Sequence, residues 1–462
     1  MPYKTHNHID MKERCSTRAA LTEASTTGGL SLRANFSWTF FGNSIYSACQ
    51  WGAVVALAKL SSPVIVGQYA LGVAIAMPVM SLTSLQLRPV IASDVRETYK
   101  LGDYLGFRLF STALALVIIV AIPFLLHSGP SATLLTALIG LSLAIENVSD
   151  IYYARLQFID RMDRIAKSQL LRAPLGLLAM GLGVYFSGQL SWGIAAMVLV
   201  RVTVLFAYDS RIRTQSLQTL DSDSPESRIA LENIRQILRP RWELRQMGRL
   251  LWLALPLGIV AMLVNLNVNV PRYFIQWKLG SRELGIYSAL AFLMSAGNLF
   301  VGALAQAVFV RLARFYAQGQ RRAFAFLLLK LIAIGTALGA GGMLVAWLEG
   351  ARLMTFIYRP EYAAESHLLV WIMAVAWIGF LGQFTGYAMT SARLFVHQIP
   401  LFALGVLVIT AGSYWLVPLM GLQGAILASL AGVLIQLLAS VGVLAHGLIK
   451  IPEIRSEAAT LA

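Results

Sequence analysis

Residues 109–126 read LFSTALALVIIVAIPFLL, a run of eighteen positions without a charged side chain. A helix needs about twenty apolar residues to cross the hydrocarbon core of a bilayer. Similar runs recur along the chain, and the expected spans are 36–58, 64–87, 109–126, 131–148, 169–187, 190–208, 249–270, 284–310, 324–348, 367–390, 399–417 and 421–447. The sequence therefore predicts an all-α polytopic membrane protein with about twelve transmembrane helices.

The composition also indicates that lipid surrounds most of the chain. Hydrophobic residues make up 57% of the 462 residues, charged residues only 13%, and the mean hydropathy is +0.68. A soluble protein usually carries about a quarter charged residues, so this chain could not cover a water-facing surface. The net charge of +15 does not indicate a nucleic-acid partner, because Lys and Arg lie in short clusters between apolar runs.

The basic residues predict the orientation. With the N-terminus inside, only six of the 37 Lys and Arg residues fall on the outer side, two fall inside spans, and the other 29 lie in inner segments. The outer six are Lys59, Arg272, Lys278, Arg282, Arg352 and Arg359. This bias follows the positive-inside rule. We expect a multi-pass membrane protein with both termini in the cytoplasm.

The spans divide into two groups of six. The expected parts are an N-terminal tail at 1–35, a first lobe at 36–208, a cytoplasmic linker at 209–248, a second lobe at 249–448 and a C-terminal tail at 449–462. The linker begins rich in Ser and Asp and then becomes basic, which is typical of a helix lying on anionic headgroups. Residues 59–70 and 278–288 share a Lys-Leu pair followed by Gly-x-Tyr (GQYA and GIYS), so the lobes could be parallel repeats.

Enzyme and cofactor motifs are missing. The sequence contains no phosphate-binding GxxxxGK[ST] loop, no HExxH pair and no GxSxG nucleophile elbow. Cys15 and Cys49 lack the spacing of a metal site. We therefore predict a protein that is not an enzyme and needs no metal or cofactor.

Ionisable residues within spans carry more information, because each costs several kcal/mol unless it is paired or faces water. Arg201 and Lys330 either extend to the inner interface or line a cavity as cations for a phosphate-bearing substrate. Glu146 and Asp150 are one helical turn apart. We expect them near the membrane edge, paired with basic residues such as Arg155, and a role in ion coupling is the weaker alternative.

Two span ends also bear polar groups. Arg88 precedes Pro89, which we expect to end the second span, and serves either as an inner anchor or as a cation at the mouth of a cavity. Asn265, Asn267 and Asn269 alternate at the end of the seventh span. Amides are unfavourable in lipid, so this stretch is expected to face the bundle interior or a polar cavity.

Scattered motifs resemble a known family. They are Gly42-Asn43, Tyr46, Gln50-Trp51, Lys59-Leu60, 66–72, Pro78, 85–88, Ser93-Asp94, 102–108, 269–275, 284–290, 358–362 and 421–425. Together they resemble the polysaccharide flippases of bacteria, the O-antigen and capsule repeat-unit translocases of the multidrug/oligosaccharidyl-lipid/polysaccharide exporter superfamily. The linker at 209–248 is longer than this resemblance leads us to expect.

The resemblance implies two six-helix lobes around a central cavity. It implies transport of undecaprenyl-diphosphate-linked oligosaccharide repeat units to the outer leaflet by alternating access, for O-antigen (lipopolysaccharide), capsule or exopolysaccharide synthesis. The lipid-linked substrate and membrane lipids are then the expected partners, and a polysaccharide polymerase and export machinery are further candidates. The residues we expect to contact substrate are Arg272, Arg201, Lys330, Arg88, Tyr46, Trp51, Tyr273, Asn265 and Asn269.

Two other functions remain open from sequence. An ion-coupled drug or cation antiporter of the same superfamily would need a carboxylate in the membrane, for which Glu146 and Asp150 are the candidates. A membrane polysaccharide polymerase or ligase would generally need a large outer loop, and the largest expected outer segment is about 349–366.

Overall fold

The computed structural model describes residues 31–93, 101–158, 161–209, 240–392, 394 and 397–449. Over these residues the chain forms helices and no strand, which confirms the predicted all-α class. The two tails, except for a few residues at their inner ends, and the predicted interfacial helix of the linker lie outside the described residues.

The first lobe contains eight helical elements. They are α2 (Leu32–Leu60), α3 (Pro63–Ser84), α4 (Leu87–Ser93), α5 (Leu101–Leu125), α6 (Pro130–Phe158), α7 (Met162–Ser187), α8 (Leu190–Val204) and the π-helical turn η1 (Leu205–Asp209). The second lobe contains α11 (Leu244–Lys278), α12 (Ser281–Phe292), α13 (Met294–Ala317), α14 (Arg321–Ile357), α15 (Pro360–Ala363), α16 (Ser366–Ser391) and α17 (Gln398–Ile449).

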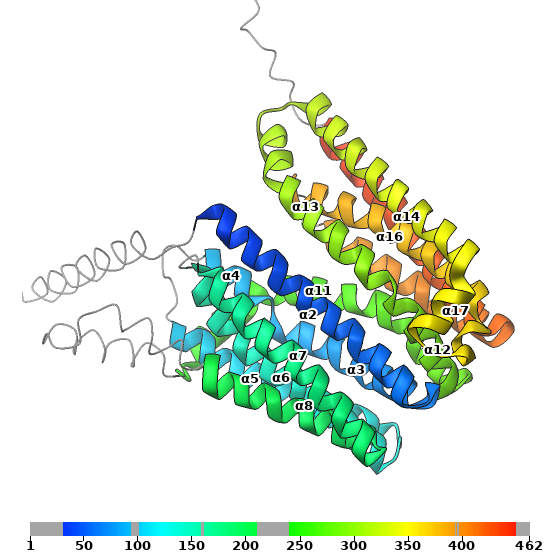
Figure 1. The fold of residues 1–462 in the computed structure, drawn as a ribbon. Helices are drawn as coiled ribbons and strands as arrows, with labels where there is room; N and C mark the ends of the chain where they lie inside the picture. The colour runs from blue at the N-terminus through cyan, green and yellow to red at the C-terminus, as the bar shows by residue number, and fades with distance from the viewer. Residues whose placement is uncertain are drawn as a thin grey trace, which may run out of the picture.

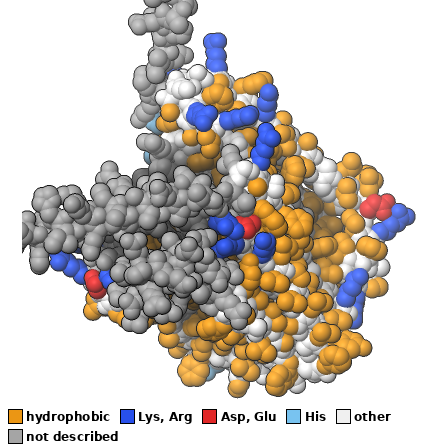
Figure 2. Space-filling model, turned by 60° about the vertical axis from the view of Figure 1, so that its left-hand side comes forward, with side chains coloured by type: hydrophobic (Ala, Val, Ile, Leu, Met, Phe, Trp, Pro, Cys, Tyr) orange, Lys and Arg blue, Asp and Glu red, His pale blue; other side chains and the backbone are white. Residues whose placement is uncertain are grey.

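Twelve membrane crossings can be counted in the described chain. Ten helices are long and apolar enough to span a bilayer. One of them, α17, is two antiparallel helices that meet at Gly421, where φ of 59° and ψ of −133° interrupt the helix. Adding the second half of α17 and the 29-residue helix α2 gives twelve. Figure 2 shows the matching surface, with hydrophobic side chains over a broad flank and Lys and Arg in a few small groups.

The two lobes form a V (Figure 1). They meet at the end where α2 joins α3 and α11 joins α12, which is the predicted outer end. One hydrophobic core continues across both lobes there and includes Val66 and Ala70 of α3 and Leu284 and Ile286 of α12. Toward the predicted inner end there are two further cores. One joins α4, α5 and α6 of the first lobe to the start of α11 around Leu250, and the other lies within the second lobe around Phe384. The start of α11 thus packs on the first lobe, whereas the rest of the second lobe has its own core there.

Two glycines make the closed end tight. A Cβ on Gly67 of α3 would lie 1.8 Å from the carbonyl oxygen of Ser281, and one on Gly285 of α12 would lie 1.9 Å from that of Pro63. These glycines occupy matching places in the two similar stretches at 59–70 and 278–288. Arg359 adds a hydrogen bond across the same end by donating to the carbonyl of Lys59. No side chain larger than hydrogen fits at either glycine without moving backbone.

Several helix ends differ from the predicted spans. The helix α3 ends at Ser84 because Leu85 and Gln86 both have φ of 49°, so Pro89 does not end it. Pro89 instead lies in the first turn of α4, where its missing N–H costs little. The expected span 284–310 is divided between α12 and α13. The helix α11 runs well beyond the expected 249–270, because its amides and arginine are buried by neighbouring helices instead of being exposed to lipid.

Candidate functional site

A cavity of about 250 Å³ lies between the lobes. Its lining combines one face of α2 with the junction of α12 and α13, and the residues are Ser47, Gln50, Trp51, Phe292, Asn298 and Leu299. The lining supplies a hydroxyl, two amides and two aromatic rings, and none of these side chains is charged. Such a mixture binds a ligand that has both hydrogen-bonding groups and apolar faces.

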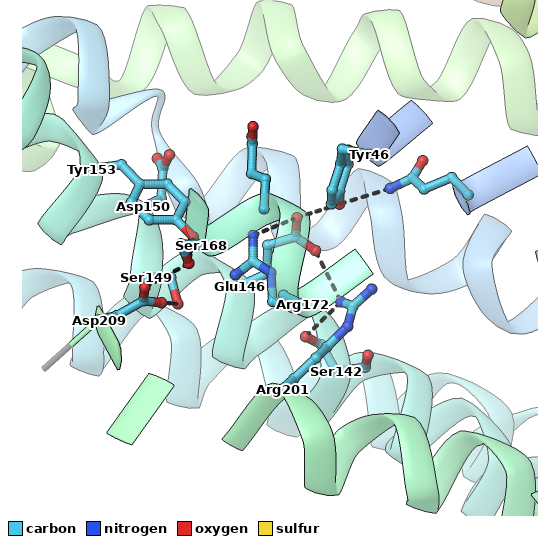
Figure 3. A network of polar contacts seen from close by, with 12 residues as sticks. Tyr46, Ser142, Glu146, Ser149, Asp150, Tyr153, Ser168, Arg172, Arg201 and Asp209 are labelled. Atoms are coloured by element: carbon cyan, nitrogen blue, oxygen red, sulfur yellow. Dashed lines mark hydrogen bonds and ion pairs between the residues drawn. The ribbon is translucent and has the colours of Figure 1, made fainter. Parts of the chain in front are cut away.

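A largely buried ion cluster lies in the first lobe (Figure 3) and is connected to this cavity through Gln50. The carboxylate of Glu146 on α6 is 2.9 Å from Arg201 Nη1 of α8 and 3.6 Å from Arg172 Nη2 of α7. Tyr46 of α2 donates its hydroxyl hydrogen to the same carboxylate. Gln50 in turn donates its amide N–H to the Tyr46 oxygen over 2.7 Å. Hydrogen bonds therefore connect the cavity wall to the ion cluster.

A second cluster surrounds Asp150, one turn further along α6. Arg88 Nη1 is 3.3 Å from this carboxylate and Arg108 Nη2 is 3.8 Å from it. Arg88 also donates to Gln157 over 2.9 Å, and Arg108 donates to the carbonyl of Ser84 over the same distance. The Arg108 side chain is only 1% exposed, so the carboxylate and the carbonyl stabilise a charge that water does not reach.

A third carboxylate, Asp209, lies fully buried at the end of the π-helical turn. It accepts hydrogen bonds from Ser149 of α6 at 2.8 Å and from Ser168 of α7 at 2.6 Å. Tyr153 shares a 2.6 Å hydrogen bond with Ser168, and its ring faces the guanidinium of Arg172 at 5.6 Å. The Tyr153 ring also faces Arg88 of the second cluster at 5.8 Å, so the three clusters form one polar interior within the first lobe. Figure 3 shows the first and third clusters, with Asp150 of the second.

Arg272 on α11 contributes a buried charge to the second lobe. Its guanidinium donates to Asn269 over 2.8 Å and faces the ring of Phe292 at 5.7 Å. Within the described chain no carboxylate lies within 4.0 Å of it. Phe292 also lines the inter-lobe cavity, so Arg272 lies directly behind that wall.

The remaining residues of α11 bind the neighbouring helices. Asn265 donates to Ser81 of α3 over 2.8 Å, Asn267 donates to the carbonyl of Phe402, and Asn269 is 3% exposed. Tyr273 donates to the carbonyl of Ala74. The amides therefore face the bundle interior, as predicted, and Asn265 and Tyr273 attach α11 to the first lobe.

The structure separates the predicted substrate-contact residues into different groups. Trp51 lines the cavity, and Tyr46 reaches it through Gln50. Arg201 and Arg88 are paired with Glu146 and Asp150, whereas Arg272, Asn265, Asn269 and Tyr273 belong to α11. Lys330 is exposed and lies over the ring of Phe326 at 4.4 Å, apart from these groups. Its position agrees with extension of the side chain to the interface.

The two carboxylates of α6 require a correction. The helix α6 continues twelve residues beyond Glu146, to Phe158, and so extends past the expected span end at 148. Both carboxylates are paired with arginines, as expected in kind, but their partners come from other helices. The side chain of Arg155 lies outside the described residues.

Arg108 and Arg172 are functional-site candidates that sequence reasoning missed. We assigned both to inner segments that orient the protein. The helices α5 and α7 begin at Leu101 and Met162, so each arginine lies at least two turns inside a helix. The position of Arg172 three residues inside the expected span 169–187 was an available signal. Gln50, Asn298 and Phe292 carried no such signal.

The three clusters and Arg272 together contain more arginines than carboxylates. Five arginines (Arg88, Arg108, Arg172, Arg201 and Arg272) accompany three carboxylates, those of Glu146, Asp150 and Asp209. The described first lobe also buries the carboxylates of Asp103 and Asp163, the latter paired with Arg161 and Lys167. A low-dielectric interior makes an uncompensated positive charge costly. An anionic group that entered the space between the lobes would reduce that cost.

Comparisons with known proteins agree with this architecture. No family model matches the chain. A capsular polysaccharide biosynthesis protein, CapF of Staphylococcus aureus, is 22% identical over 397 residues, which cover 85% of this chain and 94% of that protein. Because the identity is low, the match supports a resemblance between the two chains.

Solved structures share the fold. An inward-facing structure of a multidrug resistance MATE family transporter of the MOP superfamily matches with a TM-score of 0.60 and 13% identity, over 93% of this chain and 98% of that one. An outward-facing structure of such a transporter matches with a TM-score of 0.58 and 11% identity, over 90% of this chain and 94% of that one. A MOP superfamily transporter from Pyrococcus furiosus matches with a TM-score of 0.57 and 13% identity, over 89% of this chain and 95% of that one. The chain is a multi-pass membrane protein with the two-lobed fold of MOP superfamily transporters, and its likeness to a capsular polysaccharide biosynthesis protein agrees with the resemblance to the polysaccharide flippases of that superfamily.

Proposed function

We propose that this protein moves undecaprenyl-diphosphate-linked oligosaccharide repeat units from the inner to the outer leaflet of the bacterial cytoplasmic membrane. The two lobes would alternate between a V open to the cytoplasm and one open to the outside. The product would supply the synthesis of a surface polysaccharide, such as capsule, exopolysaccharide or O-antigen. The CapF relative, whose name refers to capsular polysaccharide biosynthesis, supports this choice of substrate class.

The observation that carries the proposal is the adjacency of two environments. An uncharged cavity lined by amides and aromatic rings lies between the lobes, and arginines in excess over carboxylates lie behind its walls. A lipid-linked oligosaccharide has the same two parts, since it joins polar uncharged groups to an anionic diphosphate. Neither part crosses hydrocarbon unaided, and a polar path between two lobes lowers that barrier.

The pairing of the carboxylates disfavours a drug or cation antiporter. Glu146 has two arginines within 4.0 Å and Asp150 has two more. A cation that bound either carboxylate would first have to displace an arginine. Asp209 has hydroxyl partners, but it lies fully buried and apart from the cavity lining.

The outer connections disfavour a polymerase or ligase. Most of the expected outer segment 349–366 is helical, because α14 continues to Ile357 and α15 and α16 follow closely. The other described connections at that end contain only a few residues, such as 61–62 and 279–280. The described chain therefore offers no large outer loop on which catalytic groups could be placed.

Leaflet-resolved analysis of the lipid-linked intermediate tests the proposal. In a strain lacking this protein, we expect the undecaprenyl-diphosphate-linked repeat unit to accumulate in the inner leaflet, and re-expression should restore it to the outer leaflet. A strain lacking a downstream polymerase is the control and should accumulate it outside. Outer-leaflet accumulation without this protein would contradict the proposal and favour the polymerase alternative.

A further inference from the structure

The inter-lobe cavity has aromatic rings from both lobes. Trp51 comes from α2 in the first lobe, and Phe292 comes from the end of α12 in the second. Its volume of about 250 Å³ is smaller than that of typical sites for drug-sized ligands, which are roughly 300–1,000 Å³. It therefore suits one compact part of a larger substrate. The two rings offer apolar surfaces against which the C–H faces of a sugar ring can pack.

Hydrogen bonds fix which atoms the polar wall presents. Arg201 and Arg172 hold Glu146 as an acceptor, so the hydroxyl hydrogen of Tyr46 points to Glu146. The Tyr46 oxygen can then only accept, and it accepts from Gln50 Nε2 over 2.7 Å. The carbonyl oxygen Oε1 of Gln50 is thereby left for the cavity. The wall offers an acceptor to a ligand hydroxyl or amide N–H.

The same arrangement disfavours a negative charge. None of the six lining side chains is a cation that could neutralise a carboxylate. The arginines of the first lobe lie beyond the negative Glu146, and Arg272 lies behind the ring of Phe292. A carboxylate in the cavity would face the Gln50 carbonyl oxygen and would exchange water for only the neutral donors of Ser47 and Asn298.

We propose that this cavity is a subsite for one uncharged sugar ring of the lipid-linked substrate, held between Trp51 and Phe292 and donating a hydrogen bond to Gln50 Oε1. The inference rests on the proposed function, and it specifies a preference among sugars within that function. Tyr46 is a positioning residue here, because it acts through Gln50. Trp51 and Phe292 contact the sugar directly.

Equilibrium binding to the purified full-length protein in lipid nanodiscs tests the subsite. The probes are undecaprenyl diphosphate alone, the same lipid bearing N-acetylglucosamine, and the same lipid bearing glucuronic acid. We expect the N-acetylglucosamine lipid to bind at least about tenfold more tightly than the glucuronic acid lipid. Equal affinity for the two glycolipids would overturn the inference.

Substitutions locate the preference. Trp51→Ala and Phe292→Ala should each weaken binding of the N-acetylglucosamine lipid about five- to tenfold relative to binding of the sugar-free lipid. Tyr46→Phe should reduce the discrimination between the two glycolipids about threefold or more, because Gln50 is no longer held in one orientation. Trp192→Ala is the matched control, since Trp192 is 64% exposed on α8 and outside the cavity lining. An equal loss for the sugar-free lipid would contradict a sugar subsite.

Methyl glycosides of the two sugars separate this inference from the proposed function. If none of the three lipids binds, the proposed function fails. Even in that case, saturation-transfer NMR should detect stronger binding of the methyl N-acetylglucosamine glycoside than of the methyl glucuronic acid glycoside. Trp51→Ala should abolish the saturation-transfer signal of the N-acetylglucosamine glycoside. If neither glycoside gives a signal that depends on Trp51, the subsite is refuted as well.

Discussion

The two lobes have the same number of membrane crossings but different interiors. The first holds arginines and carboxylates from six helical elements in three connected clusters. Among the described residues of the second lobe, Arg272 is the one buried charged side chain, and the core around Leu328, Phe380 and Phe384 is apolar. A shared helical plan therefore does not require shared chemistry. Under the proposed function, the first lobe supplies most of the charge that attracts an anionic substrate.

The largest expected effect comes from removing the carboxylate of Glu146, which lies at the centre of the charged interior. Glu146→Ala leaves Arg172, which is 3% exposed, and Arg201, which is 13% exposed, without their shared carboxylate. Breaking a buried ion pair from one side costs about 3–5 kcal/mol, so the melting temperature in detergent should fall steeply. Glu349→Ala removes an exposed carboxylate from its pair with Arg352 in the second lobe and should change stability by less than about 0.5 kcal/mol. Similar melting temperatures for both variants would remove the contrast between the lobes.

The next effect concerns the contact that both lobes share. Gly67→Ala places a methyl group against the backbone of Ser281, and the resulting overpacking should cost about 1–3 kcal/mol at the closed end. We expect the lobes to separate there, as measured by the distance between spin labels at Val64→Cys and Arg282→Cys in a background without native cysteines. Gly341→Ala is the matched control, because nothing lies within 4 Å of its added Cβ. An unchanged distance in Gly67→Ala would show that the closed end is not set by this contact.

The third prediction is that one substitution lowers transport without lowering stability. Arg272→Leu removes a buried charge that has an amide and an aromatic ring but no carboxylate beside it. Replacing such a charge by an apolar group should leave the protein equally or more stable. Transport of the lipid-linked substrate into the opposite leaflet of proteoliposomes should nevertheless fall about tenfold, equivalent to losing one charge-assisted contact. Arg272→Lys keeps the charge, so its transport rate should lie between those of the unaltered protein and Arg272→Leu. Full transport by Arg272→Leu would assign this arginine to folding alone.

The smallest effect tests the hydrogen-bonded edge of the charged interior. Tyr46→Phe removes the hydroxyl that joins Glu146 to Gln50 and should lower the free energy of unfolding by about 0.5–1.5 kcal/mol. Tyr185→Phe removes a hydroxyl from a residue that is 69% exposed on α7 and serves as the control. Equal stability of the two variants would show that Tyr46 contributes little to holding Glu146.

Much of the membrane plan could be predicted from local sequence. Runs such as 109–126 define helices because each backbone polar group in lipid must be satisfied within its own helix. The alternating amides at Asn265, Asn267 and Asn269 correctly indicated a face turned away from lipid. Helix ends were less predictable. The left-handed residues Leu85 and Gln86 end α3 before Pro89 is reached, and neither residue type signals that conformation.

The site was predicted only in part. Arg201 and Glu146 were both recognisable as ionisable groups within spans, but they are 55 residues apart in sequence, and nothing local pairs them. Arg108 and Arg172 were mistaken for orienting charges because the spans were expected to begin too late. The cavity joins α2 to α12 and α13, and its amides and rings are common residues of membrane helices.

The sequence by itself determined the solvent, the approximate number of crossings, the division into two groups and the resemblance to polysaccharide flippases, because these depend on composition, run length and short motifs. Only the tertiary structure decided that Gly67 meets Gly285, that four arginines share two carboxylates of α6, and that Trp51 and Phe292 line one cavity. The physical reason is that hydrophobicity acts on each helix separately, whereas ion pairs, close backbone contacts and cavities depend on which helices pack together.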